Sequence, residues 1–261
     1  MDFTIKKYIE LIRCFQTSGY LFVPFEDYCR GVDGKRFVIL RHDVDRKAYN
    51  SLRIAQIEHS FGVKASYYFR FGYWNSGLEI IKEIVSLGHE IGYHYEDLVL
   101  FNGDKEKAID HFKKQLMHFR QFYPVRSICM HGSPKSKIDS RDIWNSYDYH
   151  DFGIIGEPYF DVDYSNVFYL TDTGRCWDGF NVSLRDKIPC YQTKWSEKGL
   201  LYHNTDDIIA ALTEGSFPNQ LMLTTHPQRW TDNSIEWTME LLSQSLKNVV
   251  KGTMVRFSRG L

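Results

Sequence analysis

The stretch FVILRHDVD, residues 37–45, organises the rest of this chain. Its first four residues are apolar and β-branched at the centre, which is typical of a buried strand. Its last five residues include four ionisable side chains. Because ligands of α/β proteins bind where parallel strands end, the stretch predicts a strand over 37–42 that delivers His42, Asp43 and Asp45 to a functional site.

Strand and helix patterns alternate along the rest of the chain. Strands are predicted at 64–71, 89–95, 125–131, 152–155, 167–170 and 220–225, and helices at 3–18, 46–60, 77–87, 104–123, 205–212 and 233–250. Most helices show apolar residues at three- and four-residue spacing. In the last one these are Ile235, Met239, Leu242, Leu246 and Val249. Residues 20–34 contain turn signals and are predicted to be irregular.

Repeated strand–helix units with short connections imply parallel strands joined by right-handed crossovers. About seven strands fit the chain length, which favours a (β/α) barrel, complete or incomplete, over an open doubly wound sheet. No glycine-rich nucleotide-binding sequence follows a predicted strand. We therefore expect one α/β domain over 1–261, with 1–34 as an N-terminal helical and irregular extension.

Composition is that of an ordinary globular protein, with 43% hydrophobic and 25% charged residues and a net charge of −1. The absence of long runs of like charge argues against nucleic acid or an anionic membrane as the main partner. No apolar run approaches the roughly 18 residues of a membrane span, and no signal peptide is recognisable, so a cytoplasmic location is expected. Five widely spaced cysteines are expected to be reduced and buried.

Ionisable residues gather where the predicted strands end. The first strand ends in Asp43 and Asp45, the third in His94, Tyr95, Glu96 and Asp97, the fourth in His131, and the last in His226. Because parallel strands end at the same edge of a sheet, these side chains should converge. Imidazole and carboxylate groups in one place suit a divalent metal and an acid/base pair.

These residues also have structural interpretations. Asp43 and Asp45 are placed to cap a helix that begins near residue 46, and the other candidates fit hydrogen-bonded positions at strand ends or in loops. Arg41 is expected to pair with a neighbouring acid. Four further histidines, at 59, 111, 118 and 203, have no recognisable partners and are treated as structural.

The motifs LRHDVD at 40–45, GHEIGYH at 88–94 and LTTH at 223–226 resemble those of polysaccharide deacetylases, the NodB-type group or carbohydrate esterase family 4. The resemblance covers roughly residues 37–230, and its most specific part is GHEIGYH. It implies a distorted (β/α)7 TIM-like barrel and a divalent metal, usually zinc. It also implies hydrolysis of an N-acetyl amide, less often an ester, on a sugar or glycan precursor.

The same resemblance implies roles for individual residues. Asp43 matches the general base that deprotonates water, and Asp45 matches the metal-binding aspartate. His94 matches the first metal histidine, and His226 matches the general acid that protonates the leaving amine. Such an acid is required because an amine anion is too poor a leaving group at neutral pH.

The sequence departs from the family in the metal site. The acidic pair is normally adjacent, whereas Val44 separates Asp43 from Asp45 here; an extended backbone would still place both carboxylates on one face. The family's second metal histidine falls at Leu98, which cannot bind a metal. One of four residues must then replace it, namely Glu96, Asp97, His42 or His131, or the site is weakened or lost.

Of these, Glu96 and His131 are the predicted additional ligands, and His131 has the alternative role of orienting the base. Arg41, Tyr95 and Trp177 are expected to contact the substrate, with Trp177 in the place of the family's pocket tryptophan. Three functions remain open at this stage. They are a metal-dependent deacetylase, a metal-independent amidohydrolase on the same barrel, and a catalytically degenerate barrel that binds a glycan or a partner.

Overall fold

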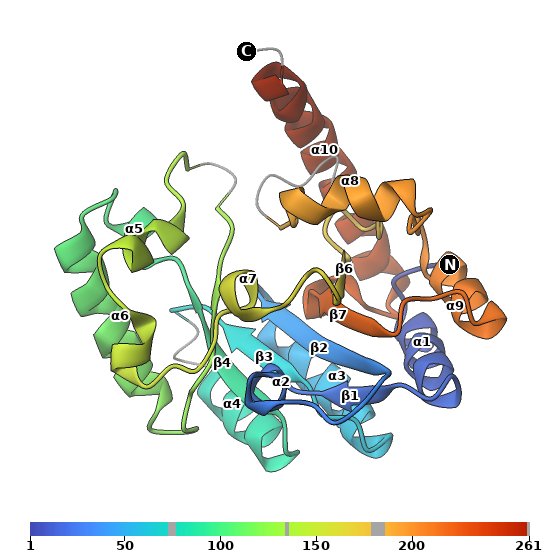
Figure 1. The fold of residues 1–261 in the computed structure, drawn as a ribbon, viewed down its shortest axis with the longest axis horizontal. Coiled ribbons are helices and arrows are strands. Elements are labelled where there is room, and N and C mark those ends of the chain that lie inside the picture. Colours follow the sequence, from blue (N-terminus) through green and yellow to red (C-terminus); the bar gives the residue numbers. More distant parts are fainter. Residues whose placement is uncertain (73–76, 134–135, 179–185, 260–261) are drawn as a thin grey trace.

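The structure is a computed structural model that describes residues 1–72, 77–133, 136–178 and 186–259, with side chains described as far as Val249. Parallel strands form one curled sheet, a half-barrel, in the order β5-β4-β3-β2-β7-β6, and β1 pairs with β2 off this path (Figure 1). The strands are β1 (Leu21–Val23), β2 (Phe37–Val44), β3 (Ser66–Phe69), β4 (Glu90–Tyr95), β5 (Ile128–Met130), β6 (Phe168–Thr171) and β7 (Gln220–Thr225). The predicted α/β fold, a distorted (β/α)7 barrel of parallel strands, is confirmed.

Helices connect these strands and cover the sheet (Figure 1). They are α1 (Ile5–Thr17), α2 (Phe25–Arg30), α3 (Ala48–Ser60), α4 (Gly77–Ser86), α5 (Asp97–Leu100), α6 (Lys105–Phe119), α7 (Pro158–Asp161), α8 (Pro189–Glu197), α9 (Thr205–Glu214) and α10 (Ser234–Arg259), with 3-10 turns η1 (Ser140–Asn145), η2 (Tyr149–Phe152) and η4 (Pro227–Arg229). The start of α9 has a capping box in which Asn204 and Asp207 bond to each other's backbone.

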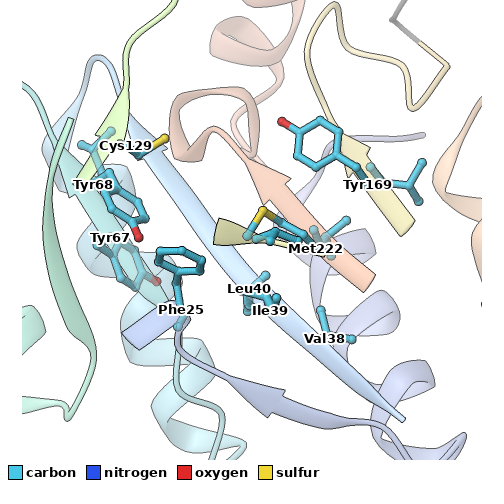
Figure 2. Close-up of a cluster of buried hydrophobic side chains, with 14 of the residues drawn as sticks. Phe25, Val38, Ile39, Leu40, Tyr67, Tyr68, Cys129, Tyr169 and Met222 are labelled. Atoms are coloured by element: carbon cyan, nitrogen blue, oxygen red, sulfur yellow. The ribbon is translucent and has the colours of Figure 1, made fainter. Parts of the chain in front are cut away.

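Strand β2 is the centre of the sheet. On one side residues 37–39 pair with β1 and residues 41–44 with β3, and on the other side residues 37–42 pair with β7. All eight of its residues are buried. Figure 2 shows Val38, Ile39 and Leu40 of β2 among core side chains from neighbouring elements, including Phe25 of α2 and Met222 of β7. This environment fits the apolar start of the stretch, because a strand buried on both faces needs no polar alternation.

Two predictions for the segments around the sheet were wrong. Residues 20–34 are not irregular, because they form β1 and α2 and contribute a strand to the sheet. The strand expected at 152–155 is absent; η2 ends there, and the nearby sheet contact is an isolated bridge between Ser127 and Gly156. Asp148 caps η2 and Gly153 ends it in a left-handed conformation. These two turn residues favour a short helix over the strand that the apolar residues at 152–155 suggest.

The last helix, α10, forms where it was predicted, but its apolar stripe does not face the sheet. Ile235, Met239, Leu242, Leu246 and Val249 are each between 60% and 71% exposed. Figure 1 shows α10 extending away from the rest of the molecule. Within the described residues, no helix has both the length and the apolar character needed to cross a bilayer.

Candidate metal centre and active site

The end of β2 directs three charged side chains to one face. Successive residues of a strand point to opposite sides, so Arg41 and Asp43 share a face, and Asp45 continues the alternation just past the strand. His42 points the other way, where its ring lies within hydrogen-bond distance of Glu58 (2.7 Å) and Thr225 (2.7 Å). His42 is thus separated from the carboxylates that adjoin it in sequence.

Three histidines from other strand ends face Asp45. The Nε2 atoms of His94 and His131 lie 3.6 Å and 3.5 Å from Oδ1 of Asp45. Nε2 of His226 lies 3.8 Å from the other carboxylate oxygen. His94 is on β4, while His131 and His226 directly follow β5 and β7. Parallel strands therefore bring these groups to one edge, as the strand-end pattern predicted.

The inner nitrogens of two of these rings are already bonded. Nδ1 of His94 lies 2.9 Å from the carbonyl oxygen of Cys129, which can only accept, so Nδ1 carries the hydrogen. Burial lowers the pKa of His94 to about 4, although Asp43 acts in the opposite direction. The imidazole is therefore neutral at pH 7, with the lone pair of Nε2 directed at Asp45.

His131 is oriented in a similar way by a carboxylate. Its Nδ1 lies 2.8 Å from Glu96, which also forms an ion pair with Arg70. Burial raises the pKa of Glu96, but the hydrogen bond from His131 and the charge of Arg70 outweigh it and lower the pKa to about 2. Glu96 is thus an ionised group behind His131, in the place where metal sites commonly have a carboxylate that orients a histidine.

Asp45, His94 and His131 offer ligand atoms that all lie within 4.8 Å of one another. Two imidazoles and a carboxylate form a donor set that suits zinc and other divalent transition metals and leaves positions open. These residues fit the metal that the sequence predicts. Leu98, which occupies the family's second histidine position, is buried in α5, and His131 supplies a second imidazole from a different strand.

Asp43 is bound by Arg41, and one of its carboxylate oxygens also lies 3.7 Å from Nε2 of His94. Nε and one terminal nitrogen of Arg41 donate to the two carboxylate oxygens, at 2.8 Å and 2.6 Å. Burial raises the pKa of Asp43, but the Arg41 guanidinium and then His94 more than offset this and hold the pKa below its usual value. Asp43 therefore remains an ionised carboxylate beside the metal-ligand candidates.

His226 is held by Asp172, which follows β6. Nδ1 of His226 donates to Asp172 at 2.6 Å, and Arg229 and Trp230 donate to the same carboxylate at 2.6 Å and 2.9 Å. Burial and Arg229 lower the pKa of His226, but Asp172 and Asp45 outweigh them, so the pKa is raised. A histidine oriented through Nδ1 in this way presents Nε2 for proton transfer.

Other predicted site residues lie outside the cluster of ligand atoms. Glu96 is behind His131, as described above. Trp177 packs against Phe3 and Trp230 and donates to Thr205, which links the β6–α9 region to the N-terminal segment. Tyr95 is buried against Phe112 and Trp144. Arg41 is buried and bound to Asp43, so its charge is directed at the carboxylate.

Sequence reasoning missed Asp172 and Cys129. Asp172 lies two residues after the predicted strand at 167–170, within the range of positions that the other candidates occupy at their strand ends, so the strand-end pattern was sufficient to find it. The Cys129 thiol lies with Asp43 and His94 in a second group of possible ligand atoms within 4.8 Å. It had no sequence signal beyond its position in a strand. Burial raises the pKa of Cys129 well above its usual value, so the thiol is protonated and unreactive.

Comparison with protein-family models gives no match, and comparison with curated proteins gives none either. Solved structures of carbohydrate esterase family 4 are similar to this chain at low identity. A CE4 family pseudoenzyme from Bacillus anthracis is 15% identical over 85% of this chain, with a TM-score of 0.44, and the chain spans 63% of that protein's length.

Two further structures of this family show a likeness of the same degree. A family 4 carbohydrate esterase from Bacillus anthracis is 13% identical over 90% of this chain and 85% of its own, with a TM-score of 0.44. A family 4 acetyl xylan esterase from Clostridium thermocellum, in complex with a cobalt ion, is 15% identical over 80% and 83%, with a TM-score of 0.41. The chain is thus distant from these proteins, and the roles proposed below rest on its own side-chain geometry.

Proposed function

We propose that this protein is a metal-dependent hydrolase of the polysaccharide deacetylase type, which cleaves an N-acetyl amide on a sugar or glycan precursor. The observation that supports this most is the meeting of three units at one edge of the sheet. They are the ligand set Asp45, His94 and His131, the ion pair Arg41–Asp43, and the hydrogen-bonded pair His226–Asp172.

Asp45, His94 and His131 would hold the metal, with zinc as the proposed ion. A divalent cation bound there supplies Lewis acidity, which polarises a carbonyl oxygen and makes water more acidic. His94 and His131 are fixed in the required orientation through their Nδ1 atoms, by the Cys129 carbonyl and by Glu96. Glu96, first expected as a ligand, is therefore proposed to orient His131.

Hydrolysis adds the oxygen of water to the amide carbon and breaks the carbon–nitrogen bond. Asp43 is ionised by its pairing with Arg41 and is proposed to accept the proton that water loses. His226 lies across the cluster, 3.8 Å from Asp45, and is proposed to donate a proton from Nε2 to the leaving nitrogen. Asp172 holds His226 in that orientation and stabilises its charged form.

The first experiment measures metal content by inductively coupled plasma mass spectrometry, with and without added zinc. We expect about one metal per chain, lost in His94→Ala and in His131→Ala. His150→Ala is the matched control, because His150 is an exposed histidine bonded to Asp148 outside the cluster. Absence of metal under every loading condition contradicts the proposal.

The second experiment measures acetate release from N-acetylated amino sugars before and after chelation. Turnover that stops on chelation and returns with zinc supports the proposal. Turnover that persists without metal supports the alternative of a metal-independent amidohydrolase on the same barrel. Saccharide binding without turnover supports a catalytically degenerate barrel. The cytoplasmic location of the substrate remains a prediction from the sequence.

A further inference from the structure

The outward face of α10 carries an apolar stripe. Its members Ile235, Met239, Leu242, Leu246 and Val249 are 60% to 71% exposed. Elsewhere in the described part of the chain, large exposed apolar side chains are mostly scattered singly, which is ordinary for a protein surface. A contiguous apolar row along a helix instead marks an interaction site.

The spacing of this stripe identifies the kind of surface that fits it. Its residues follow one another at intervals of four, three, four and three. This is the pattern of the two apolar positions of a heptad, and it makes a narrow seam suited to a second helix. Of the residues beside the seam, Thr238, Ser243 and Ser245 are small and uncharged, so they let another helix approach closely, while Glu236 flanks its start.

The opposite face of α10 already binds the rest of the molecule. The Trp237 indole donates to the backbone carbonyl of Asp2 at 2.7 Å. Gln244 is buried and bonds to Asn248, which donates to the carbonyl of Gly174 at 2.8 Å. These contacts fix the rotation of the helix, so the apolar stripe is held outward. Figure 1 shows α10 pointing away from the sheet.

Charge on α10 favours an antiparallel copy of the same helix. Glu236 and Glu240 lie toward the start of the stripe, and Lys247 lies toward its end. Two parallel copies would place like charges side by side, whereas antiparallel copies place the acidic part of each helix beside the basic part of the other.

We propose that two copies of this chain associate through an antiparallel pairing of their α10 helices. In the register that sets Leu242 of one copy against Leu246 of the other, Met239 meets Val249. Four apolar layers then close along the seam. In the same register Glu240 lies opposite position 248 of the other copy, next to its Lys247. The proposal does not depend on the catalytic function, because it concerns a surface separate from the proposed metal centre.

Sedimentation velocity of the whole chain over a range of micromolar concentrations tests the proposal. We expect a concentration-dependent species of twice the 30.8 kDa chain mass. The double variant Leu242→Asp, Leu246→Asp should raise the dimer dissociation constant by at least about 100-fold, because it buries unpaired carboxylates in the seam. Met117→Glu is the matched control, since Met117 is a similarly exposed apolar residue on α6.

A charge exchange tests the antiparallel arrangement. Glu240→Lys should weaken the dimer by about two- to fivefold, as expected for an exposed ion pair, and adding Lys247→Glu should restore the affinity. A monomer at every concentration, or a dimer unaffected by the substitutions in α10, overturns the proposal. So does a monomer that binds anionic vesicles through the same stripe, because that result assigns the face to lipid. Circular dichroism checks that each variant is folded.

Discussion

Asp43 is the proposed general base, because it is ionised and buried beside the ligand cluster. Asp43→Asn preserves the shape of the side chain but removes the charge that accepts a proton. We expect turnover to fall by about 10²–10⁴-fold while metal content stays near one per chain. Kinetics and elemental analysis on the same preparation check this. Loss of metal together with activity would mean that Asp43 is a ligand and that its role is exchanged with that of Asp45.

His226 and Asp172 form the second pair whose roles can be separated by substitution. His226→Ala should lower turnover by about 10²–10⁴-fold because the leaving nitrogen then lacks its proton donor. Asp172→Asn should have an effect in the same direction, since it alters the hydrogen bond that fixes the histidine tautomer. An unchanged rate in His226→Ala would remove His226 from the site. His203→Ala, at an exposed histidine paired with Asp178, is the control.

At the scale of residues, the rule that strand ends converge predicted the candidate cluster well. It predicted that Asp43, Asp45, His94 and His226 lie together, as their contacts show. It did not separate ligands from the groups that orient them, because that depends on which atoms meet across the sheet. Glu96 was expected as a ligand, yet its partner Arg70 lies 26 positions away in the sequence, and no local pattern links the two.

Strand β4 begins with a buried acid whose titration should be visible in the stability of the protein. Glu90 accepts hydrogen bonds from Ser66 and Ser127 and from the backbone nitrogen of Glu26. Burial raises its pKa from 4.5 to about 7, and these bonds only partly oppose the shift. The folded state therefore binds this proton more tightly than the unfolded state does.

The sign of the effect follows from this difference. Between pH 4.5 and about 7 the folded protein holds more protons, so the Glu90 contribution to the free energy of unfolding falls as pH rises, by up to about 3 kcal/mol. Glu90→Gln should make the free energy of unfolding depend less on pH in this range. At pH 8 the variant should therefore compare more favourably with the unmodified protein than it does at pH 4.5. Urea unfolding at several pH values measures it. An unchanged slope would show that Glu90 titrates normally.

The success of sequence prediction differed between elements for physical reasons. Most of the periodic helices and the buried strands at 37–44 and 220–225 were predicted close to their observed bounds, because burial imposes a clear pattern. Helix α10 instead continues to Arg259, nine residues past its predicted end. Strand β1 was missed because three residues are too few to show a period. The false strand at 152–155 arose because apolar residues were given more weight than the cap at Asp148 and the turn at Gly153.

For the whole molecule, metal binding and folding should be coupled. Asp45, His94 and His131 come from the ends of three different strands, β2, β4 and β5, so the ligand set exists only when the sheet is formed. Zinc at about 100 times its dissociation constant should add about 2.7 kcal/mol to the free energy of unfolding. For a chain of this size, that corresponds to an increase in Tm of roughly 5–10 °C.

Differential scanning calorimetry with zinc and with a chelator measures this shift. His131→Ala should abolish most of it, and His150→Ala should leave it unchanged. Equal Tm values with and without zinc in the unmodified protein would contradict the assignment of the metal centre.

The pairing of β2 also has a consequence for how the chain is made. Its two main neighbours both follow it in the sequence but at very different distances: β3 begins within about 30 residues, whereas β7 begins only at Gln220. During synthesis from the N-terminus, one edge of the central strand therefore stays without its partner until most of the chain has been translated. An exposed apolar edge of this kind favours mispairing with other chains. Ribosome-bound chains that end before residue 220 should accordingly be strong clients of chaperones that shield strand edges.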